Sequence, residues 1–294
     1  MVVTGREGQV VTALIERAEL GGRNPGRFEV IALGRPELDL SQPEAIETAL
    51  VAAKPDVIVS AAAYTAVDQA ETDEEAATVI NGTAAGSIAK AAAKLGIPVI
   101  QISTDYVFDG SKASPYLETD PVAPIGAYGR SKLAGERAVA EATPNHAILR
   151  TAWVYSPFGK NFLKTMLKLA ETRDALNVVS DQVGNPTSAL DIADAVLTVA
   201  GNLLDSNADA LRGVFHITGS GEASWADFAT EIFASSATRG GPSASVAGIP
   251  SSAYPTPARR PANSRLVCNR LSSSHGVTLP DWKASTADVV ARLV

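Results

Sequence analysis

The sequence predicts an α/β fold: a Rossmann-type, doubly wound parallel sheet with a smaller C-terminal substrate-binding region. Short runs rich in valine and isoleucine alternate with helical patterns through the first 150 residues, as in a sheet covered by helices on both faces. A glycine-containing turn directly follows the first run, where such folds bind a dinucleotide. The 294 residues, 46% of them hydrophobic, suffice for one large domain or two smaller ones.

The apolar runs define the expected strands, and most are followed by a helical pattern. Strands are predicted at 1–4, 28–33, 56–62, 98–104, 146–151, 176–181 and 213–218. Helices are predicted to begin near Gly8, Pro43, Asp73, Tyr128, Lys160 and Leu190. The Ser-, Ala-, Pro- and Gly-rich segment 235–262 predicts a long surface loop, and a terminal helix follows it.

This pattern divides the chain into two expected parts. Residues 1–152 are predicted to form an NAD(P)-binding Rossmann domain. Residues 153–294 are predicted to form mainly a substrate-binding region. Segments at about 176–205 and the terminal helix are expected to return to the Rossmann domain.

Composition excludes several classes of protein. The net charge of -7 argues against nucleic-acid binding and mildly against binding to anionic membranes. The single cysteine, Cys268, excludes an internal disulfide and any multi-cysteine metal site, and the three histidines are far apart in the sequence, so no metal is predicted. Neither a signal peptide nor a long apolar segment is recognisable, and a cytoplasmic location is expected.

The turn after the first strand is the first candidate cofactor site. Gly5 and Gly8 lack side chains, so backbone N–H groups and a helix N-terminus can approach a pyrophosphate. Gln9 and Val10, at the start of the helix, are included in this site. Val11 stands where a third glycine is usual, and we expect it to widen the contact between helix and strand without removing the phosphate site.

Residues after the second and third strands extend this candidate site. Arg35 follows the second strand, where an acidic residue would repel a 2′-phosphate and a guanidinium favours one. We therefore expect NADPH to be preferred, with NADH possible. Asp39 and Leu40 are expected to border the adenine, and the small residues Ala61–Ala63 allow a flat cofactor to lie against the backbone.

A tyrosine and a lysine at helical spacing suggest proton transfer. Tyr128 and Lys132 are four residues apart and share a helix face, while Thr104 ends the fourth strand at the same edge of the sheet. Alone, such a pair is commonly a half-buried ring beside a solvated amine. Together the three suit ketone reduction: Thr104 orients the carbonyl, Tyr128 donates the proton, and Lys132 lowers the pKa of the phenol.

These residues resemble those of the extended short-chain dehydrogenase/reductase family. The generic likeness consists of the G-x-x-G turn at 5–8, Thr104 and Y-x-x-x-K at 128–132. Longer segments resemble one of its branches, the dTDP-4-dehydrorhamnose reductases, over nearly the whole chain. They are AAAYTAVDQAE, ISTDYVFDG, AYGRSKLAGE, ILRTAWVYSPFGKNF, DQVGNPTSALDIAD and RPANSRL.

The resemblance implies NAD(P)H-dependent reduction of the 4-keto group of a dTDP-4-keto-6-deoxy sugar. It implies that Tyr128 and Lys132 are the catalytic pair, assisted by Thr104. The family's substrate pocket corresponds here to Thr65, Val67, Thr104, Tyr106, Phe108, Trp153, Asn185 and Arg260; Trp153 is equally compatible with the core. Some family members dimerise through a metal held by acidic residues, but Ala13 occupies one expected position, so a monomer or homodimer without metal is expected.

Two other functions remain open on the sequence. One is a sugar-nucleotide epimerase or dehydratase that recycles bound NAD; Asp105, beside Thr104, is compatible with elimination of water. The other is a regulatory subunit that binds a nucleotide and a partner enzyme without turnover. The intact set of Thr104, Tyr128 and Lys132 argues against the second, because a binding module needs no tuned phenol.

Overall fold

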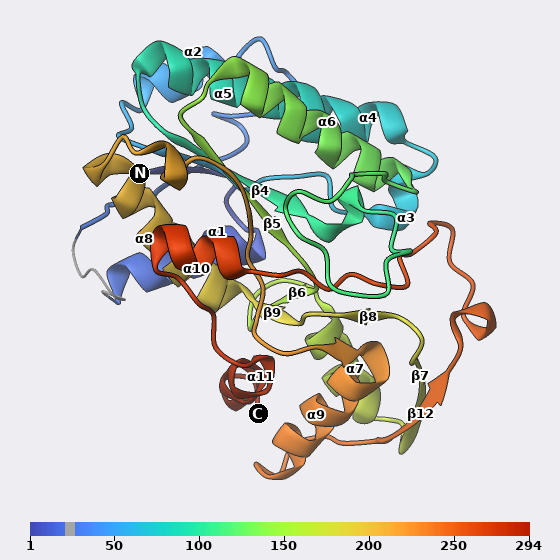
Figure 1. The fold of residues 1–294 in the computed structure, drawn as a ribbon. Coiled ribbons are helices and arrows are strands. Elements are labelled where there is room, and N and C mark those ends of the chain that lie inside the picture. The colour runs from blue at the N-terminus through green and yellow to red at the C-terminus, as the bar shows by residue number, and fades with distance from the viewer. Residues whose placement is uncertain (21–26) are drawn as a thin grey trace.

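A computed structural model describes residues 1–20 and 27–294 and has the predicted parallel α/β architecture (Figure 1). The six strands of its central sheet are parallel and run in the order β2-β1-β3-β4-β5-β10. Between β2 and β3 the chain crosses to the other side of β1, so the strand order reverses between β1 and β3. Ligands of doubly wound folds bind at this point, outside the carboxyl ends of the strands. The strands are β1 (Val2–Thr4), β2 (Ile31–Leu33), β3 (Ile58–Ser60), β4 (Val99–Thr104), β5 (His146–Thr151) and β10 (Gly213–His216).

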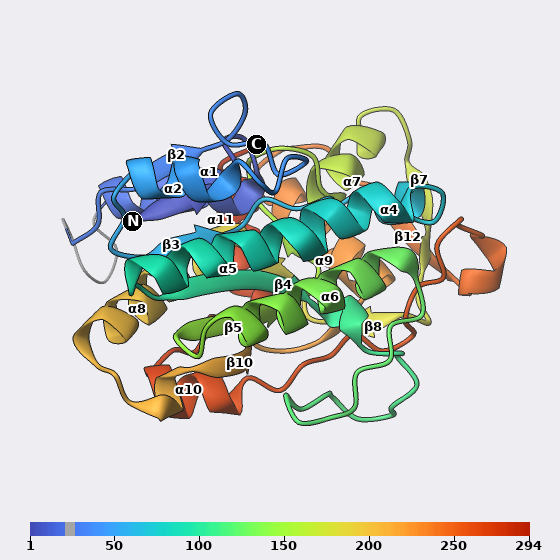
Figure 2. The same cartoon turned by 90° about the horizontal axis from the view of Figure 1, so that it is seen from above.

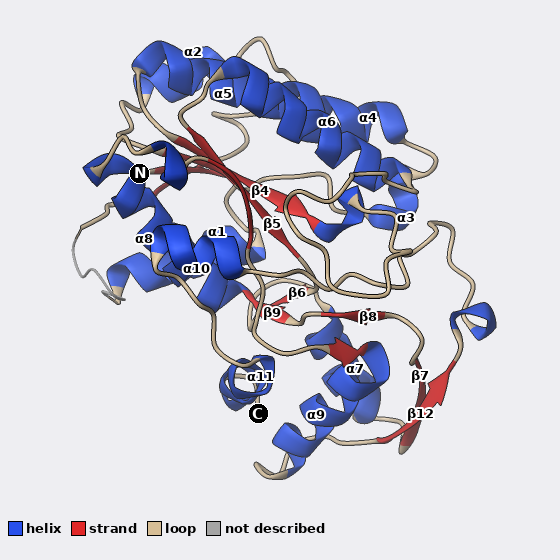
Figure 3. Cartoon of the chain, viewed as in Figure 1, coloured by secondary structure: helices blue, strands red, loops and turns tan. Residues whose placement is uncertain are grey.

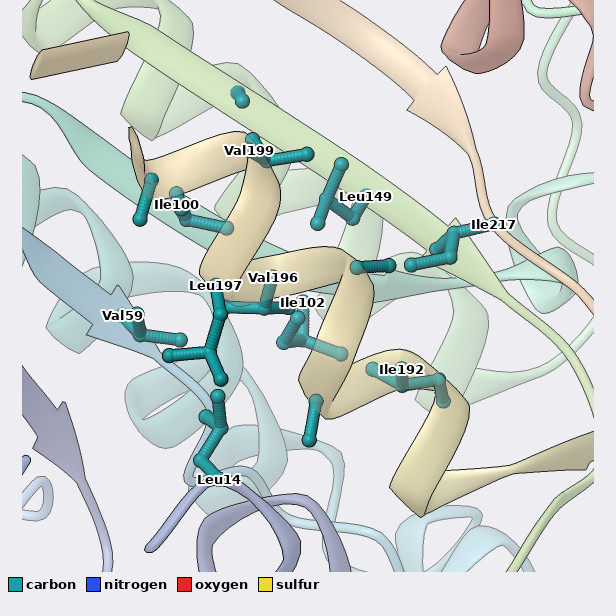
Figure 4. Packing of buried hydrophobic residues seen from close by; sticks show 14 of the residues in the cluster. Leu14, Val59, Ile100, Ile102, Leu149, Ile192, Val196, Leu197, Val199 and Ile217 are labelled. Carbon is teal, nitrogen blue, oxygen red and sulfur yellow. The ribbon is translucent and has the colours of Figure 1, made fainter. Parts of the chain in front are cut away.

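Helices cover both faces of this sheet, since successive strand residues point to opposite sides. Val3 and Val59 pack into one core, whereas Val2 and Ile58 pack into the other. On the first face, Leu14 and several side chains of α8 meet the strand residues (Figure 4). The helices of that face are α1 (Gln9–Glu19), α8 (Ala189–Asp205) and α10 (Asn269–His275). Those of the second face lie side by side in Figure 2 and are α2 (Ile46–Ala52), α5 (Ala84–Leu95) and α6 (Ala127–Ala142).

A third hydrophobic cluster forms the smaller region, drawn below the main sheet in Figure 3. Its helices are α7 (Phe162–Ala170), α9 (Trp225–Ala237) and α11 (Trp282–Ala291). Three two-stranded sheets pair β7 (Ala175–Val179) with β12 (Ser245–Ile249), β8 (Val183–Gly184) with β11 (Ala223–Ser224), and β6 (Val154–Tyr155) with β9 (Thr187–Ser188). The remaining short elements are α3 (Val67–Ala70), α4 (Glu74–Thr78), the π-helical turn η1 (Val79–Thr83), and the 3₁₀ turns η2 (Asp105–Val107), η3 (Asp209–Leu211) and η4 (Ser251–Ala253).

Some segments lie in places that the sequence pattern did not indicate. The strand expected at 176–181 is β7, and it pairs in parallel with β12 instead of joining the main sheet. β12 itself lies inside segment 235–262, which was expected to be a loop; its residues are largely exposed, so they give little apolar signal. Helix α8 packs against α1 on the main sheet, whereas the terminal helix α11 packs on α9 in the third cluster.

In the part of the chain that the structure describes, no helix combines the length and apolar character needed to cross a bilayer.

Helix α6 lies unusually close to its neighbours. A Cβ atom on Gly135 would lie 2.1 Å from the carbonyl oxygen of Asn81, and one on Gly129 would lie 2.2 Å from the carbonyl oxygen of Tyr106. Both obstacles are backbone atoms, which cannot rotate away as a side chain can. The two glycines therefore allow α6 to approach the backbone of η1 and of η2.

We predict that Gly135→Ala destabilises the protein. Alanine favours a helix by about 1 kcal/mol over glycine, but the clash with Asn81 forces the backbone to shift, and overpacking of this kind costs about 1–3 kcal/mol. Equilibrium unfolding in urea measures the net loss. The control is Gly82→Ala on the other side of the same contact, where the nearest atom is the Ala134 Cβ at 3.3 Å. A Gly135→Ala midpoint at or above that of the control contradicts the packing argument.

Candidate functional site

A cavity of about 650 Å³ opens at the carboxyl ends of β1, β3, β4 and β5. A second cavity of about 470 Å³ adjoins it beside β2, and the two share the lining residues Gly5, Glu7, Ala62 and Ala63. Both volumes are in the range of small-molecule sites in proteins. Together they form a continuous site across the point where the strand order reverses.

The glycine turn lies where these cavities meet. Gly5 has a φ of 98°, a conformation that favours glycine, and a Cβ there would lie 3.3 Å from both Ala62 Cβ and Val11 Cγ2. The Thr4 hydroxyl accepts hydrogen bonds from the backbone N–H groups of Ala61 and Ala62, each at 3.1 Å, and so holds the loop after β3 against the turn.

Val11 lies at this contact. Its side chain is buried in the first core, and its Cγ2 would lie 3.3 Å from a Cβ on Gly5. The expected widening of the contact between helix and strand stays a prediction. Gly8, Gln9 and Val10 line the larger cavity. Gly8 caps α1 with no side-chain hydrogen bond in the described structure, so the first backbone N–H groups of the helix remain available to an anion.

The second cavity is lined by charged groups of both signs, Arg6 and Arg35 together with Glu7 and Asp39. Arg35, Asp39 and Leu40 line it as predicted from the sequence, together with Arg6, which sequence reasoning missed. The Asp39 carboxylate accepts hydrogen bonds from the backbone N–H and hydroxyl of Ser41, and these lower its pKa, with a smaller contribution from Arg35. The Asp39 carboxylate is therefore already hydrogen-bonded by Ser41. The guanidinium of Arg6 is paired with the Glu37 carboxylate at 2.5 Å.

The three predicted catalytic side chains meet in the larger cavity. Thr104 ends β4, and Tyr128 and Lys132 lie in the first turns of α6. The ammonium of Lys132 donates a 2.7 Å hydrogen bond to the carbonyl of Ile102. Burial lowers the pKa of Lys132 to about 8, and the nearby Glu136 carboxylate opposes this shift.

The electrostatics of Tyr128 differ from the expectation. Burial raises the pKa of its phenol, the negative charge of Asp105 raises it further, and a hydrogen bond with Thr104 acts in the opposite direction. The expected net lowering of this pKa is not found, because desolvation outweighs every influence that favours the phenolate. The ammonium of Lys132 is bonded to the carbonyl of Ile102. The phenol therefore stays protonated at neutral pH.

Asp105, which the sequence offered only as compatible with elimination of water, lines the larger cavity. It is 3% exposed; its Oδ1 accepts a 3.1 Å hydrogen bond from Thr104, and its Oδ2 has no partner among the described residues. Burial raises the pKa of this carboxyl to about 6. Thr151, opposite Thr104 on β5, also lines the cavity with an unpartnered hydroxyl. Thr104 was selected because it ends a parallel strand at the ligand-binding edge of the sheet. The same criterion would also have selected Asp105 and Thr151.

The cavity is also lined by further residues that sequence reasoning did not select. Most lie at strand ends or in the loop before α7, where they could have been found by extending the same rule. They are Glu7, Val11, Ile102, Ser103, Ala152, Val154, Gly159 and Lys160.

The predicted substrate residues have three different placements. Thr65, Val67, Tyr106 and Trp153 line the larger cavity with Thr104. Arg260 is not a lining residue of this cavity but contacts one of them: its guanidinium donates to the Tyr106 hydroxyl at 3.1 Å and to the Asp68 carboxylate at 2.9 Å.

Phe108 and Asn185 are not brought to the cavity in the described structure. Phe108 is 1% exposed and stacks on Tyr116 with ring centroids 4.2 Å apart. Asn185 donates to the carbonyl of Gly221 at 2.6 Å and accepts from the N–H of Leu266 at 2.8 Å. These two side chains stabilise the fold around the site, which corrects their expected contact with a substrate.

Comparisons with known proteins agree with this geometry. The family model described as "RmlD substrate binding domain" matches residues 1–294. The chain is 51% identical over 294 residues to the dTDP-4-dehydrorhamnose reductase of Sinorhizobium fredii, covering 100% of this chain and 97% of that protein. It resembles the crystal structure of a dTDP-4-dehydrorhamnose reductase from Clostridium acetobutylicum, with a TM-score of 0.90, 38% identity and coverage of 99% and 98% of the two chains. The corresponding values for the Bacillus anthracis dTDP-4-dehydrorhamnose reductase in complex with NADP are 0.89, 31%, 99% and 98%.

We predict that Asp105→Asn raises thermal stability at pH 8. The folded carboxyl has a pKa of about 6, above its unfolded value, so its stabilising contribution is lost as pH rises from about 4 through 6. At pH 8 the ionised group costs up to about 3 kcal/mol, which asparagine avoids. Melting temperatures of both proteins should differ most at pH 8 and less at pH 5. A variant that is less stable at pH 8, or a difference independent of pH, contradicts the assignment.

Proposed function

Since the chain belongs to the RmlD substrate binding domain family, we propose that it reduces the 4-keto group of a dTDP-4-keto-6-deoxy sugar with NADPH, converting dTDP-4-dehydrorhamnose to dTDP-L-rhamnose. The observation that carries this proposal is the convergence of Thr104, Tyr128 and Lys132 in a cavity that continues into the glycine turn. We propose that residues 1–152 bind the cofactor and that parts of 153–294 complete the substrate site. The enzyme is proposed to act in the cytoplasm as a monomer or homodimer.

The lining of the two cavities fits NADPH. Gly5 leaves open the space that a side chain would fill, and the N-terminus of α1 beyond Gly8 suits a pyrophosphate. Arg35 suits the 2′-phosphate that distinguishes NADPH from NADH, and Arg6, paired with Glu37, lines the same end of the site. When bound, the cofactor supplies a hydride to the carbonyl carbon of the sugar.

The protein's own side chains donate the proton and stabilise the charge that remains after its transfer. The phenol of Tyr128 is protonated at neutral pH because burial raises its pKa, so it can protonate the sugar oxygen as negative charge develops there. Thr104 orients that oxygen through its hydroxyl. Lys132, with a pKa of about 8, is mostly cationic at pH 7 and offsets the charge left on the tyrosine after transfer.

We predict that Tyr128→Phe abolishes most turnover while leaving the fold and NADPH affinity unchanged. Loss of a general acid typically costs 10²- to 10⁴-fold in rate, so kcat should fall at least about 100-fold. The assay supplies dTDP-4-dehydrorhamnose, follows NADPH oxidation and identifies the sugar product. Tyr254→Phe, at an exposed tyrosine, is the matched control and should behave as wild type.

Two outcomes of this assay would contradict the proposed function. Full activity in Tyr128→Phe would exclude the tyrosine as proton donor. Product formation by the wild type without an equal amount of NADPH oxidised would indicate an enzyme that recycles its cofactor, such as an epimerase or dehydratase.

We predict that Arg35→Ala lowers the preference for NADPH over NADH. A charge-assisted hydrogen bond to phosphate contributes about 1.5–3 kcal/mol, so the ratio of kcat/KM values for the two cofactors should fall by about tenfold or more. Arg137→Ala removes an exposed arginine of α6 outside both cavities and controls for the change in net charge. An unchanged ratio in Arg35→Ala would show that this guanidinium does not select the cofactor.

A further inference from the structure

Two tryptophans form a stacked pair at the wall of the larger cavity. Trp153 lines the cavity, and its ring stacks on that of Trp225 with centroids 3.6 Å apart and planes inclined by 8°. The backbone of Trp153 has a φ of 49°, in the left-handed region that bulky residues rarely adopt. Such a conformation persists only where the surroundings fix it.

The surroundings of the pair are closely fitted. A Cβ atom on Gly184 would lie 2.5 Å from the ring of Trp153, so only glycine leaves room for the indole at that position. Phe162 packs against Trp225 with centroids 4.6 Å apart, and the indole N–H of Trp225 donates a 3.2 Å hydrogen bond to the Gln182 side chain.

Trp225 itself is held at a defined point. It is the first residue of α9, whose N-terminus is fixed by a reciprocal pair of hydrogen bonds between Ser224 and Asp227. Gln182 in turn donates a 3.0 Å hydrogen bond to the hydroxyl of Ser251. The orientation of Trp225 is therefore set by α9 and by the loop next to β12, both outside the cavity.

We infer that Trp225 is a positioning residue, which fixes the indole of Trp153 as a rigid wall for the sugar ring of the substrate. Trp225 covers one face of that indole, and the absence of a side chain at Gly184 leaves the space that the ring occupies. Trp153 thereby presents a fixed apolar surface in the cavity that Thr104 and Tyr128 also line, against which a deoxy sugar with an apolar methyl group can be oriented. This inference rests on the proposed function.

The test compares Trp225→Ala, Trp225→Phe and Trp282→Phe with the wild type. Stacked indoles couple their electronic transitions and give paired far-ultraviolet circular dichroism bands of opposite sign. The chain has only three tryptophans, so the bands should vanish in both Trp225 variants and remain in Trp282→Phe, where a buried tryptophan of the same cluster is replaced.

Steady-state kinetics then separates positioning from folding. We expect Trp225→Ala to raise the KM for the sugar nucleotide about tenfold and to leave the KM for NADPH within about twofold of wild type. Trp225→Phe keeps an aromatic face and should restore most of the sugar affinity. Gly184→Ala displaces the Trp153 ring without altering Trp225, so it should show the same selective effect even if Trp225→Ala folds poorly.

Some results would contradict the role of Trp225 alone, and others would contradict the proposed reductase activity. An unchanged sugar KM in a folded Trp225→Ala or Gly184→Ala variant overturns the inference while the reductase activity stands. Equal losses for sugar and NADPH also overturn it. A wild type that forms no product from the 4-keto sugar overturns the proposed function, and the role of Trp225 toward the sugar with it.

Discussion

The close approach of α6 to the backbone of η1 and η2 is the constraint on which the site depends. At Gly129 and Gly135 the helix contacts the backbone carbonyls of Tyr106 and Asn81. Tyr128 immediately precedes Gly129 in the chain. Asn81 joins the same contact: its side chain bonds the N–H and carbonyl of Tyr64 and donates to the hydroxyl of Ser131. The packing of α6 thus fixes the position of Tyr128, and through Asn81 it also fixes the loop after β3 that contains Tyr64.

A buried ion pair gives this helix its position relative to the sheet. Glu136 accepts two hydrogen bonds from Arg150 of β5, at 2.9 and 2.7 Å, and a third from Ser103 of β4 at 2.5 Å. Both charged side chains are only 5% exposed. A buried pair is weak evidence for net stability, because desolvation offsets the attraction. Its three directed bonds instead set the position of α6 against two strands, and its carboxylate opposes the loss of charge on Lys132 one turn away.

The parts of the site that follow backbone rules could be predicted from the sequence, and the parts that depend on side-chain environment could not. Carboxyl ends of parallel strands meet at one edge, so Gly5, Ala61–Ala63 and Thr104 were expected to lie together, and they line adjoining cavities. Phe108 was selected by its motif alone, yet motifs also carry residues that pack, and its ring is stacked in the interior. The pKa of Tyr128 depends on burial and on the direction of the Lys132 ammonium, and helical spacing determines neither of these.

The raised pKa of Tyr128 is consistent with its proposed role as an acid. A phenol that ionises easily would often lack its proton at neutral pH, whereas a buried phenol beside a carboxylate retains it. Transfer to an oxygen that is becoming an alkoxide remains favourable, since an alkoxide is a far stronger base than a phenolate. What then needs stabilising is the phenolate, and Lys132 is the cation placed on the same helix face. The unpartnered oxygen of Asp105 and the left-handed backbone of Trp153 also reduce the free energy of unfolding, and both are located at this cavity. Such features persist only where the surrounding structure fixes them. Trp225 and Gly184 enclose the Trp153 ring, while the close packing of α6 on η2, which begins at Asp105, fixes the position of Tyr128.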